Sequence, residues 1–385
     1  MKELFAVNPS RLTWCLHDFG LAIDELCHSV GISERTIKIA LAGQAAISFS
    51  QLEKLAAFFG RGVLFFIDPS AVAEDRIHTP QFRTIQNRKP HIIPELRKLI
   101  ERAEWQREVY LSILNEAHDL ESASFELPNY QGMSAKQAGI RARTWLGLEG
   151  RQAQTIDSYR DALERKGILV FRAQGYAGNW HWGAESPVLG FSLFFDQFPV
   201  IVLRRAAWET QQAFTLMHEL GHLILHRVGS IDGAEDFRSH EKYEAEANQF
   251  AGHLLVPDEF LERIDEAQHP AQVSGLERWV SVVSRDCGVS TDVVLIRLID
   301  AGRLAQSEYE DYREWREQTG NHPVPSGGNR QYRHREPIHI LGDRYVRTVL
   351  GALSERRITI PKASSFLDNL KLKDLHELER FFVGV

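Results

Sequence analysis

The chain has 385 residues, more than one hydrophobic core usually organises, and its 43% hydrophobic and 25% charged residues are ordinary for a globular protein, so we expect two or three structural units. No apolar run reaches the roughly 18 residues needed to span a bilayer, and the start, Met1-Lys2-Glu3-Leu4-Phe5, lacks the basic-then-apolar order of a secretion signal. The net charge of −7 argues against a chain coated for nucleic acid throughout, so any DNA contact would be local.

Three cysteines, Cys15, Cys27 and Cys287, form no CxxC pair and are odd in number. This pattern predicts buried or free thiols in a reducing compartment, and it argues against a disulfide framework or a thiolate metal site. We therefore expect a cytoplasmic protein with no membrane partner.

Residues 1 to about 68 contain a run of short helices. Helices are predicted over 11–18 and 23–30, and a Gly-Ile-Ser turn then places Ser33 as the cap of a helix over 34–41. A capping box at Ser48 opens a fourth helix over 51–59, and the apolar stretch 63–67 closes the unit.

This arrangement of short helices resembles the helix-turn-helix of the Xre/Cro type, and we assign residues 1–70 to such a domain. In that fold the helix after the turn enters the major groove by its N-terminal residues. The resemblance implies DNA contacts at Ser33, Glu34, Arg35 and Lys38, with Ile37 and Leu41 facing the core.

The charge of residues 1–70 complicates DNA binding. The segment carries six Lys and Arg against seven Asp and Glu, a net charge of −1. Phosphate-binding domains are usually basic, because counterion release supplies much of their affinity. The alternative is a helix-turn-helix scaffold used for dimerisation or protein contact; we favour DNA binding.

The remaining elements alternate between helices and a few strands. A long amphipathic helix is predicted over 94–117, followed by helices over 134–146, 157–166, 209–226 and 242–255, two shorter ones within 278–304, and strands over 167–171, 190–195 and 199–203. Residues 320–337 form the clearest linker, and 338–385 a small helical tail.

The helix over 209–226 contains the sequence His218-Glu219-Leu220-Gly221-His222. Residues four apart lie on one helix face, so His218 and His222 can present imidazoles to one ion, with Glu219 beside them. A catalytic zinc holds three protein ligands and leaves a place for water, which it activates while a glutamate acts as the base. A chance match is the competing explanation, but the apolar neighbours indicate a buried helix, where polar groups need partners.

The third ligand is expected on the helix over 242–255. At 100° per residue, Glu244 lies at the edge of its apolar face, while Glu246 and Glu241 point away. We predict Glu244 as the ligand and keep Glu246 in reserve. Two histidines and a glutamate can also hold manganese or iron, so Zn²⁺ is the expected cofactor without being the only one that fits.

Four other positions lie on or near the two helices that carry the predicted ligands. Gly221 interrupts the helix and indicates close packing, or the approach of a strand or substrate. His226 continues the histidine stripe by four residues; we favour a satisfied core histidine over a group that supports the ligands. His240 and His253 are not expected to bind metal.

The segments AFTLMHELGHLILH (213–226) and YEAEANQFAGHLLVP (243–257) together resemble the ImmA/IrrE metallopeptidases. The resemblance covers about residues 80–305. It implies a zincin-like domain in which His218, His222 and Glu244 bind zinc and Glu219 is the base. Substrate would add a β-strand to either 190–195 or 199–203.

Together these features predict a mostly helical α+β protein: an all-α helix-turn-helix domain, a zincin-like domain with a small sheet, and a helical tail. The predicted function is a DNA-binding regulator with a zinc metalloendopeptidase, which cleaves one partner such as a repressor in a stress, mobile-element or toxin-antitoxin response. The alternative is an antitoxin that neutralises a partner toxin, such as a PIN-type ribonuclease, with little or no proteolysis.

The tail carries a second open choice. Its amphipathic stretch over 367–382 has two possible uses. It would dock another protein, which could be a partner or a second copy in a homodimer, or it would pack as an extension of the protease core. The two uses are equally favoured by the sequence.

Overall fold

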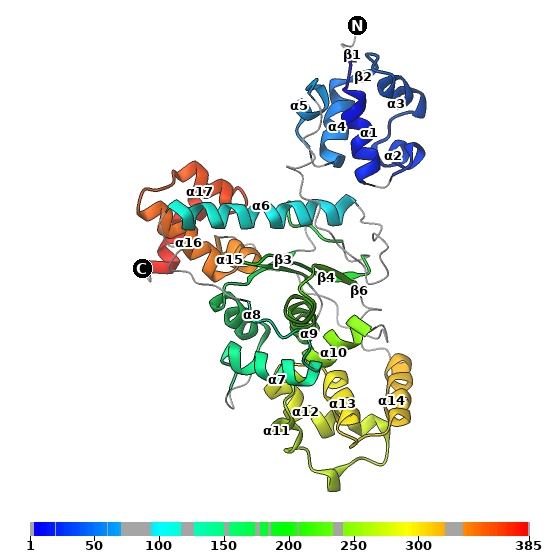
Figure 1. Ribbon diagram of the computed structural model, residues 1–385, viewed down its shortest axis with the longest axis vertical. Coiled ribbons are helices and arrows are strands. Elements are labelled where there is room, and N and C mark those ends of the chain that lie inside the picture. The colour runs from blue at the N-terminus through cyan, green and yellow to red at the C-terminus, as the bar shows by residue number, and fades with distance from the viewer. Residues whose placement is uncertain are drawn as a thin grey trace. The chain divides into compact units, whose positions relative to one another are not determined.

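A computed structural model describes residues 4–19, 21–59, 61–70, 94–116, 127–149, 154–173, 178–183, 186–205, 208–233, 242–319 and 334–383. The chain divides into two compact units (Figure 1), and α6 (Pro94–Glu116) contributes to both, since it groups with the first unit up to Arg102 and with the second from Ala103. The fold class is α+β and mostly helical, as predicted. Among the described residues, no helix combines the length and apolar character of a membrane span.

The first unit is built from short helices around its own core. Its elements are β1 (Leu4–Phe5), α1 (Pro9–Asp18), α2 (Ile23–Val30), α3 (Glu34–Leu41), β2 (Ile47–Ser48), α4 (Phe49–Phe59) and α5 (Val63–Ile67). β1 and β2 pair antiparallel, which joins the start of the unit to the segment before α4. Apolar residues from all five helices, among them Leu12, Leu26 and Ile37, are buried in one cluster.

Local capping explains where these helices begin. α1 starts two residues before its predicted beginning, because the side chain of Asn8 accepts a hydrogen bond from Ser10 N at 3.0 Å and Pro9 suits the first helical position. Ser33 caps α3 as predicted, by accepting from Thr36 N at 3.2 Å. The stretch 63–67, which was expected only as apolar chain, is a helix with Phe66 buried.

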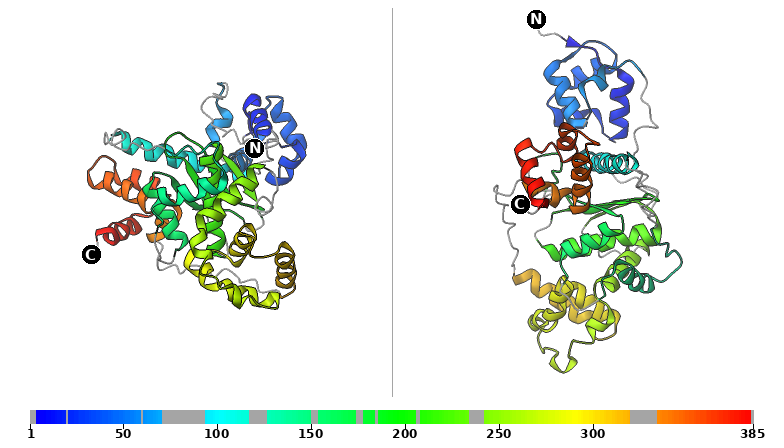
Figure 2. Two further views of the ribbon diagram at one scale, coloured as in Figure 1. Left: turned by 60° about the horizontal axis from the view of Figure 1, so that its bottom comes forward. Right: turned by 90° about the vertical axis from the view of Figure 1, so that its left-hand side faces the viewer.

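The second unit has one small sheet with helices on both of its faces (Figures 1 and 2). Its helices are α6 from Ala103, α7 (Ala135–Leu146), α8 (Ile156–Arg165), α9 (Glu209–Gly221), α10 (Lys242–Leu255), α11 (Asp258–Leu261), α12 (Leu276–Cys287), α13 (Thr291–Asp300), α14 (Gln306–Thr319), α15 (Glu336–Leu341), α16 (Asp343–Ser354), α17 (Ile360–Phe366) and α18 (Leu372–Val383). α11 and α14 were not expected from the sequence.

The sheet has the strand order β3-β5-β4-β6, with β3 (Leu169–Ala173), β4 (Val188–Leu193), β5 (Val200–Arg204) and β6 (Ser230–Gly233). β3 and β5 are parallel, and the other two pairs are antiparallel. The three predicted strands are present within two residues of their expected bounds. The prediction missed β6, which follows the histidine motif and pairs with β4.

This order corrects the expected place of an added substrate strand. Residues 190–195 include most of β4, and 199–203 include most of β5, but both strands already have a neighbour on each side. Among the described residues, β3 and β6 are the outer strands. An added strand would therefore need one of those edges.

The two faces of the sheet bury different side chains. Val170 and Ile201 join the large aliphatic cluster that includes α9 and α10. The next residues along the strands alternate to the other face, where Phe171 contacts Tyr345 of α16 with ring centroids 6.0 Å apart. Tyr110 of α6 stacks on the same tyrosine at 5.9 Å. The sheet is thus covered on both faces, which suits the nearly continuous apolar sequences of β3 and β5.

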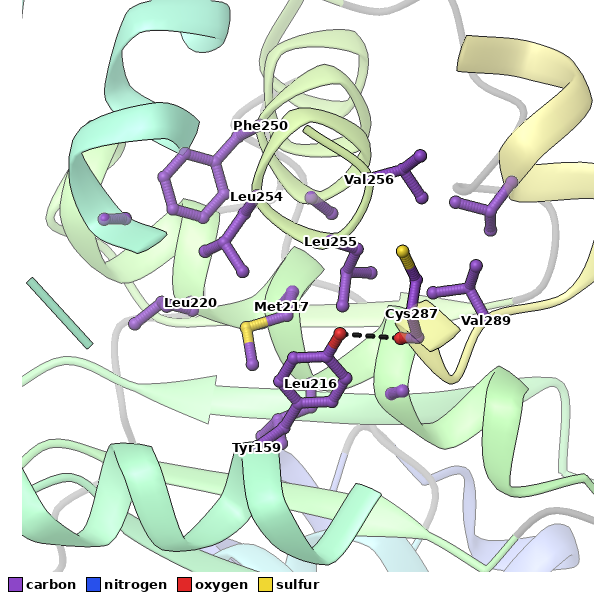
Figure 3. Packing of buried hydrophobic residues seen from close by; sticks show 14 of the residues in the cluster. Tyr159, Leu216, Met217, Leu220, Phe250, Leu254, Leu255, Val256, Cys287 and Val289 are labelled. Carbon is purple, nitrogen blue, oxygen red and sulfur yellow. Dashed lines mark hydrogen bonds between the residues drawn. The ribbon is translucent and has the colours of Figure 1, made fainter. Parts of the chain in front are cut away.

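Beneath the sheet, α9 and α10 pack their apolar faces together with α8 and the end of α12. Figure 3 shows this contact, with Leu216, Met217 and Leu220 of α9 opposite Phe250, Leu254 and Leu255 of α10. Tyr159 of α8 donates to the carbonyl of Cys287 at 2.6 Å, so it carries its hydroxyl into the core with a partner. Burial raises the pKa of Cys287 to about 12, which leaves it as a packed thiol.

The tail after residue 334 belongs to the second unit. Arg160 of α8 is almost fully buried; its guanidinium donates to the carbonyls of Ile338, His339 and Ile340, to the carbonyl of Val170, and to Glu164 at 2.7 Å. Every N–H of this side chain is used. Arg344 also bonds to Glu164. Within the amphipathic stretch 367–382, Leu370, Leu375 and Leu378 are buried, which favours a packed extension over a free docking segment.

The predicted linker, 320–337, lies mostly outside the described residues, which resume at His334. Its last two residues already belong to α15, where Pro337 is buried. The helical tail predicted over 338–385 is present as most of α15 and as α16, α17 and α18, as far as Val383.

Candidate metal centre

The site begins on α9, a helix that is buried along nearly its whole length below the sheet. His218 and Glu219 lie in its last turn, and neither side chain is exposed to solvent. At His222 the helix widens into a π-helical turn, His222–His226, where a single continuous α-helix was predicted. Such turns are rare within α-helices and are frequently found at functional sites.

The absence of a side chain at Gly221 allows α10 to approach. A Cβ there would lie 3.1 Å from Cδ1 of Phe250 and 3.3 Å from Cα of Ala247. The prediction of close packing at this glycine is therefore correct, and the neighbour is a helix. This approach brings Glu244, in the first turn of α10, to the histidines.

His218, His222 and Glu244 form a buried cluster whose ligand atoms all lie within 4.8 Å of one another. The two Nε2 atoms are 3.1 Å apart, and Oε2 of Glu244 lies 3.3 Å from His218 and 3.6 Å from His222. Tetrahedral zinc with bonds of about 2.0–2.1 Å would hold its ligand atoms about 3.3 Å apart. The spacing and the donor set of two imidazoles and one carboxylate therefore fit a metal ion with an open coordination position.

Glu219 lies beside this cluster and is held by β6 and β4. Its Oε2 accepts a hydrogen bond from the hydroxyl of Ser230 at 2.7 Å, and that hydroxyl is 2.9 Å from the hydroxyl of Ser192. A Cβ at Gly190 would lie 2.9 Å from Oε1 of Glu219 and 2.7 Å from Thr215 Cγ2. The glycine in β4 thus makes room for the carboxylate under the sheet.

His226 and Glu246 lie next to the cluster without joining it. Nδ1 of His226 is 3.0 Å from Nδ1 of His222, and its Nε2 is 3.1 Å from Oε2 of Glu246. Burial, and then the nearby His222, lower the pKa of His226 to about 4. Tyr243 lies edge-on to this imidazole, with ring centroids 4.6 Å apart.

Among the other candidates, Glu241 and His240 fall outside the described residues. His253 is buried on α10, where burial, followed by the charges of Arg297 and Lys136, lowers its pKa to about 4. Arg297 is itself buried and donates to Asp258 at 2.5 Å and to the carbonyl of Val256. This group supports the end of α10 and contributes no ligand to the cluster.

The four candidate DNA contacts are the N-cap of α3, Ser33, and three residues of the helix itself. Ser33, Glu34, Arg35 and Lys38 are exposed, and Ile37 is buried as expected, while Leu41 is half-buried. Lys38 and Glu34 form an ion pair at 2.7 Å, and hydrogen bonding to Glu34 raises the pKa of Lys38. Arg35 is exposed and forms no ion pair with the residues that the structure describes.

Ser192 and Ser230 were not foreseen from the sequence. An isolated serine has no spacing that indicates a role, and the two meet only because β4 and β6 pair. His226 and Glu246 did have a signal, since His226 extends the histidine stripe and Glu246 was the reserve ligand.

Comparison with known proteins places this site in a recognised domain. Residues 163–298, from the end of α8 to α13, match the family model of the IrrE N-terminal-like domain, peptidase family M78. The chain is also similar to the "uncharacterized immunity region protein 2" of Bacillus phage phi105, with 33% identity over 79 residues. These are 20% of this chain and 50% of the phage protein, so the chain spans about half the length of that curated relative.

Proposed function

We propose that the second unit is a zinc-dependent endopeptidase that cleaves a specific partner protein. The observation that carries this proposal is the placement of Glu219 beside three buried ligand atoms, within a segment that matches a peptidase family. A zincin-like arrangement agrees with the helix that carries the motif and with the strand β4 lying over Glu219.

The residues divide the chemistry among them. His218, His222 and Glu244 would hold Zn²⁺, which supplies Lewis acidity toward the scissile carbonyl and toward water. Glu219 would take the proton from the attacking water and pass it to the leaving amine. Ser230 donates to one oxygen of Glu219, so the carboxylate keeps its orientation through both proton transfers.

The partner is proposed from the phage relative, which is named for an immunity region. A repressor is a protein whose cleavage at a single site would change transcription. We therefore propose a repressor as the partner that is cleaved. The first unit would bring the peptidase to DNA by the exposed face of α3, in the manner of an Xre/Cro-type helix-turn-helix. Because residues 1–70 carry a net charge of −1, DNA contact by this unit would be confined to a local group of cations.

The first test is metal content and cleavage. Purified protein is expected to hold about one equivalent of zinc, and Glu219→Gln is expected to keep it while losing cleavage. Glu219→Gln protein, used as bait, should retain the uncut partner, which wild-type protein then cleaves at one site. Less than about half an equivalent of zinc in unchelated protein would overturn the metal site.

The competing function is sequestration of a partner without proteolysis, and Glu219→Gln distinguishes it from the protease. Sequestration predicts that cells carrying Glu219→Gln behave as wild type. Deletion of the tail would expose Arg160 and Phe171, which the tail covers. The role of the tail is therefore better tested at exposed apolar residues of α18, Leu372 and Phe381. If Leu372→Ser or Phe381→Ser abolishes the cellular effect and Glu219→Gln does not, the protease mechanism is wrong.

A further inference from the structure

A chain of hydrogen bonds extends from the metal cluster to the surface of α10. It starts at Nδ1 of His222, passes through both ring nitrogens of His226, and ends at Oε2 of Glu246, with steps of 3.0 and 3.1 Å. The side chain of His226 is 5% exposed and that of Glu246 is 37% exposed. The chain therefore leads from a dry centre to a carboxylate that water can reach.

The donors and acceptors along this chain follow from its last member. An ionised carboxylate only accepts, so His226 donates to Glu246 from Nε2. The other nitrogen of a neutral imidazole is then an acceptor, and Nδ1 of His226 accepts from Nδ1–H of His222. This leaves Nε2 of His222 with a lone pair, and Nε2 is the atom that faces His218 and Glu244.

Two structural features hold the chain together. The π-helical turn His222–His226 keeps the two imidazoles with ring centroids 5.1 Å apart. α10 supplies both Glu244 and Glu246. The carboxylate within the metal cluster and the carboxylate that ends the hydrogen-bond chain therefore move together with one helix. Tyr243, from the turn before, covers the second imidazole.

We propose that His226 and Glu246 are positioning residues of the metal centre, which select the tautomer and the ring orientation of the ligand His222. This inference rests on the proposed metal site and assigns a role to two residues outside the ligand set. Metal-bound histidines usually donate their second N–H to a carboxylate or a carbonyl. Here a second histidine stands between the ligand and the carboxylate.

The test measures zinc affinity by competition with a chromophoric chelator. His226→Phe and Glu246→Leu are each expected to weaken zinc binding about 10- to 100-fold. Glu246→Gln keeps an oxygen that accepts from His226, so it should lose less affinity than Glu246→Leu. The double variant should be no weaker than His226→Phe alone, because both changes break one chain.

The protein offers a matched control pair, His376 and Glu379 of α18, which is exposed and whose Nδ1 and Oε2 atoms are also 3.1 Å apart. His376→Phe and Glu379→Leu remove the same groups far along the sequence from the ligands and should leave zinc affinity unchanged. If His226→Phe fails to fold, Glu246→Leu still decides the question, because its side chain is partly exposed.

A second readout does not depend on metal. In zinc-free protein labelled with ¹⁵N-histidine, His222 should carry its proton on Nδ1, and Glu246→Leu should convert it to a mixture of tautomers. If wild-type protein binds zinc tightly and both variants bind it equally well, the positioning role is wrong while the proposed function stands. If wild-type protein binds no zinc, the proposed function and this inference fail together.

Discussion

At the residue scale, the position of Glu219 depends on what surrounds each of its two oxygens. Ser230 donates to Oε2 at 2.7 Å, and Gly190 leaves the space that Oε1 occupies. Both contacts come from strands, so the sheet holds the carboxylate on the helix below it. A hydroxyl orients a carboxylate and leaves its negative charge in place. A basic side chain at the same position would neutralise that charge and lower the pKa of the carboxylate.

We predict that Ser230→Ala lowers the kcat for cleavage of the captured partner about tenfold, with zinc content unchanged, because the carboxylate of Glu219 is then no longer held in the orientation that proton transfer needs. A tenfold loss corresponds to about 1.4 kcal/mol. The control is Ser281→Ala, since that hydroxyl bonds only to a carbonyl of its own helix, Arg278 O, at 2.8 Å. Equal kcat values for wild type and Ser230→Ala would remove the positioning role of this serine.

A second residue-scale prediction concerns acid. The folded pKa of His253 is about 4, below the usual value near 6.5, because the imidazole is buried and faces Arg297 and Lys136, with Asp258 opposing. The unfolded chain therefore takes up the proton first. The stability contribution is complete above about pH 6.5 and is lost as the pH falls towards 4, by roughly 3 kcal/mol in all.

Urea unfolding between pH 7 and 4 measures this loss. His253→Asn should flatten the slope of unfolding free energy against pH over that window, whereas His376→Asn, at an exposed histidine, should not. Parallel slopes for wild type and His253→Asn would show that His253 does not titrate as a buried group.

At the element scale, α15 and α16 are joined to α8 by polar contacts in an apolar setting. Arg160 and Glu164 form a buried pair, and burial raises the pKa of Glu164 even though Arg160 lies beside it. A buried pair of this kind is costly to half-remove, because the remaining charge has no partner. It ties the tail to the strand β3 through the carbonyls of Val170 and Ile338–Ile340.

We therefore expect Arg160→Met to lower the free energy of unfolding of the second unit by about 3–5 kcal/mol. Arg347→Met is the matched control, since Arg347 pairs with Asp343 at the exposed surface of α16, and such pairs contribute less than about 1 kcal/mol. Urea unfolding of both variants provides the comparison. Similar losses for the two would mean that the buried network does not anchor the tail.

At the scale of the whole molecule, each unit has its own buried cluster. The first gathers apolar residues between Val7 and Phe66, and the second gathers those between Leu127 and Tyr312. Separate cores allow the two units to carry separate functions. The candidate DNA contacts lie in one and the metal cluster in the other.

This separation predicts that changes at α3 affect DNA binding alone. Arg35→Ala should weaken binding to a DNA fragment selected from a random pool about 5- to 100-fold, as expected for the loss of one guanine contact, and should leave zinc content unchanged. Arg278→Ala, an exposed arginine of α12, is the control. If wild-type protein selects no DNA, the first unit is better explained as a scaffold for dimerisation or protein contact.

The sequence by itself determined most helices, three of the four strands in the sheet of the second unit, and the three candidate ligands that cluster in the structure. Periodicity and capping are local, so α3, α9 and α10 could be located from their own residues, and the inward edge of α10 pointed to Glu244. The length of 385 residues predicted two or three units, since the size of a hydrophobic core limits a single domain whatever its contacts are.

Only the tertiary structure decided the strand order, the π-helical turn and the groups that surround the site. Ser192 meets Ser230 across 38 positions of sequence, and Arg160 meets Ile338 across 178. Such contacts depend on how distant segments pack, which no local pattern encodes. The prediction that β4 or β5 would receive a substrate strand was wrong for this reason. β6 pairs with β4, and β3 pairs with β5, so neither predicted strand lies at an edge of the sheet.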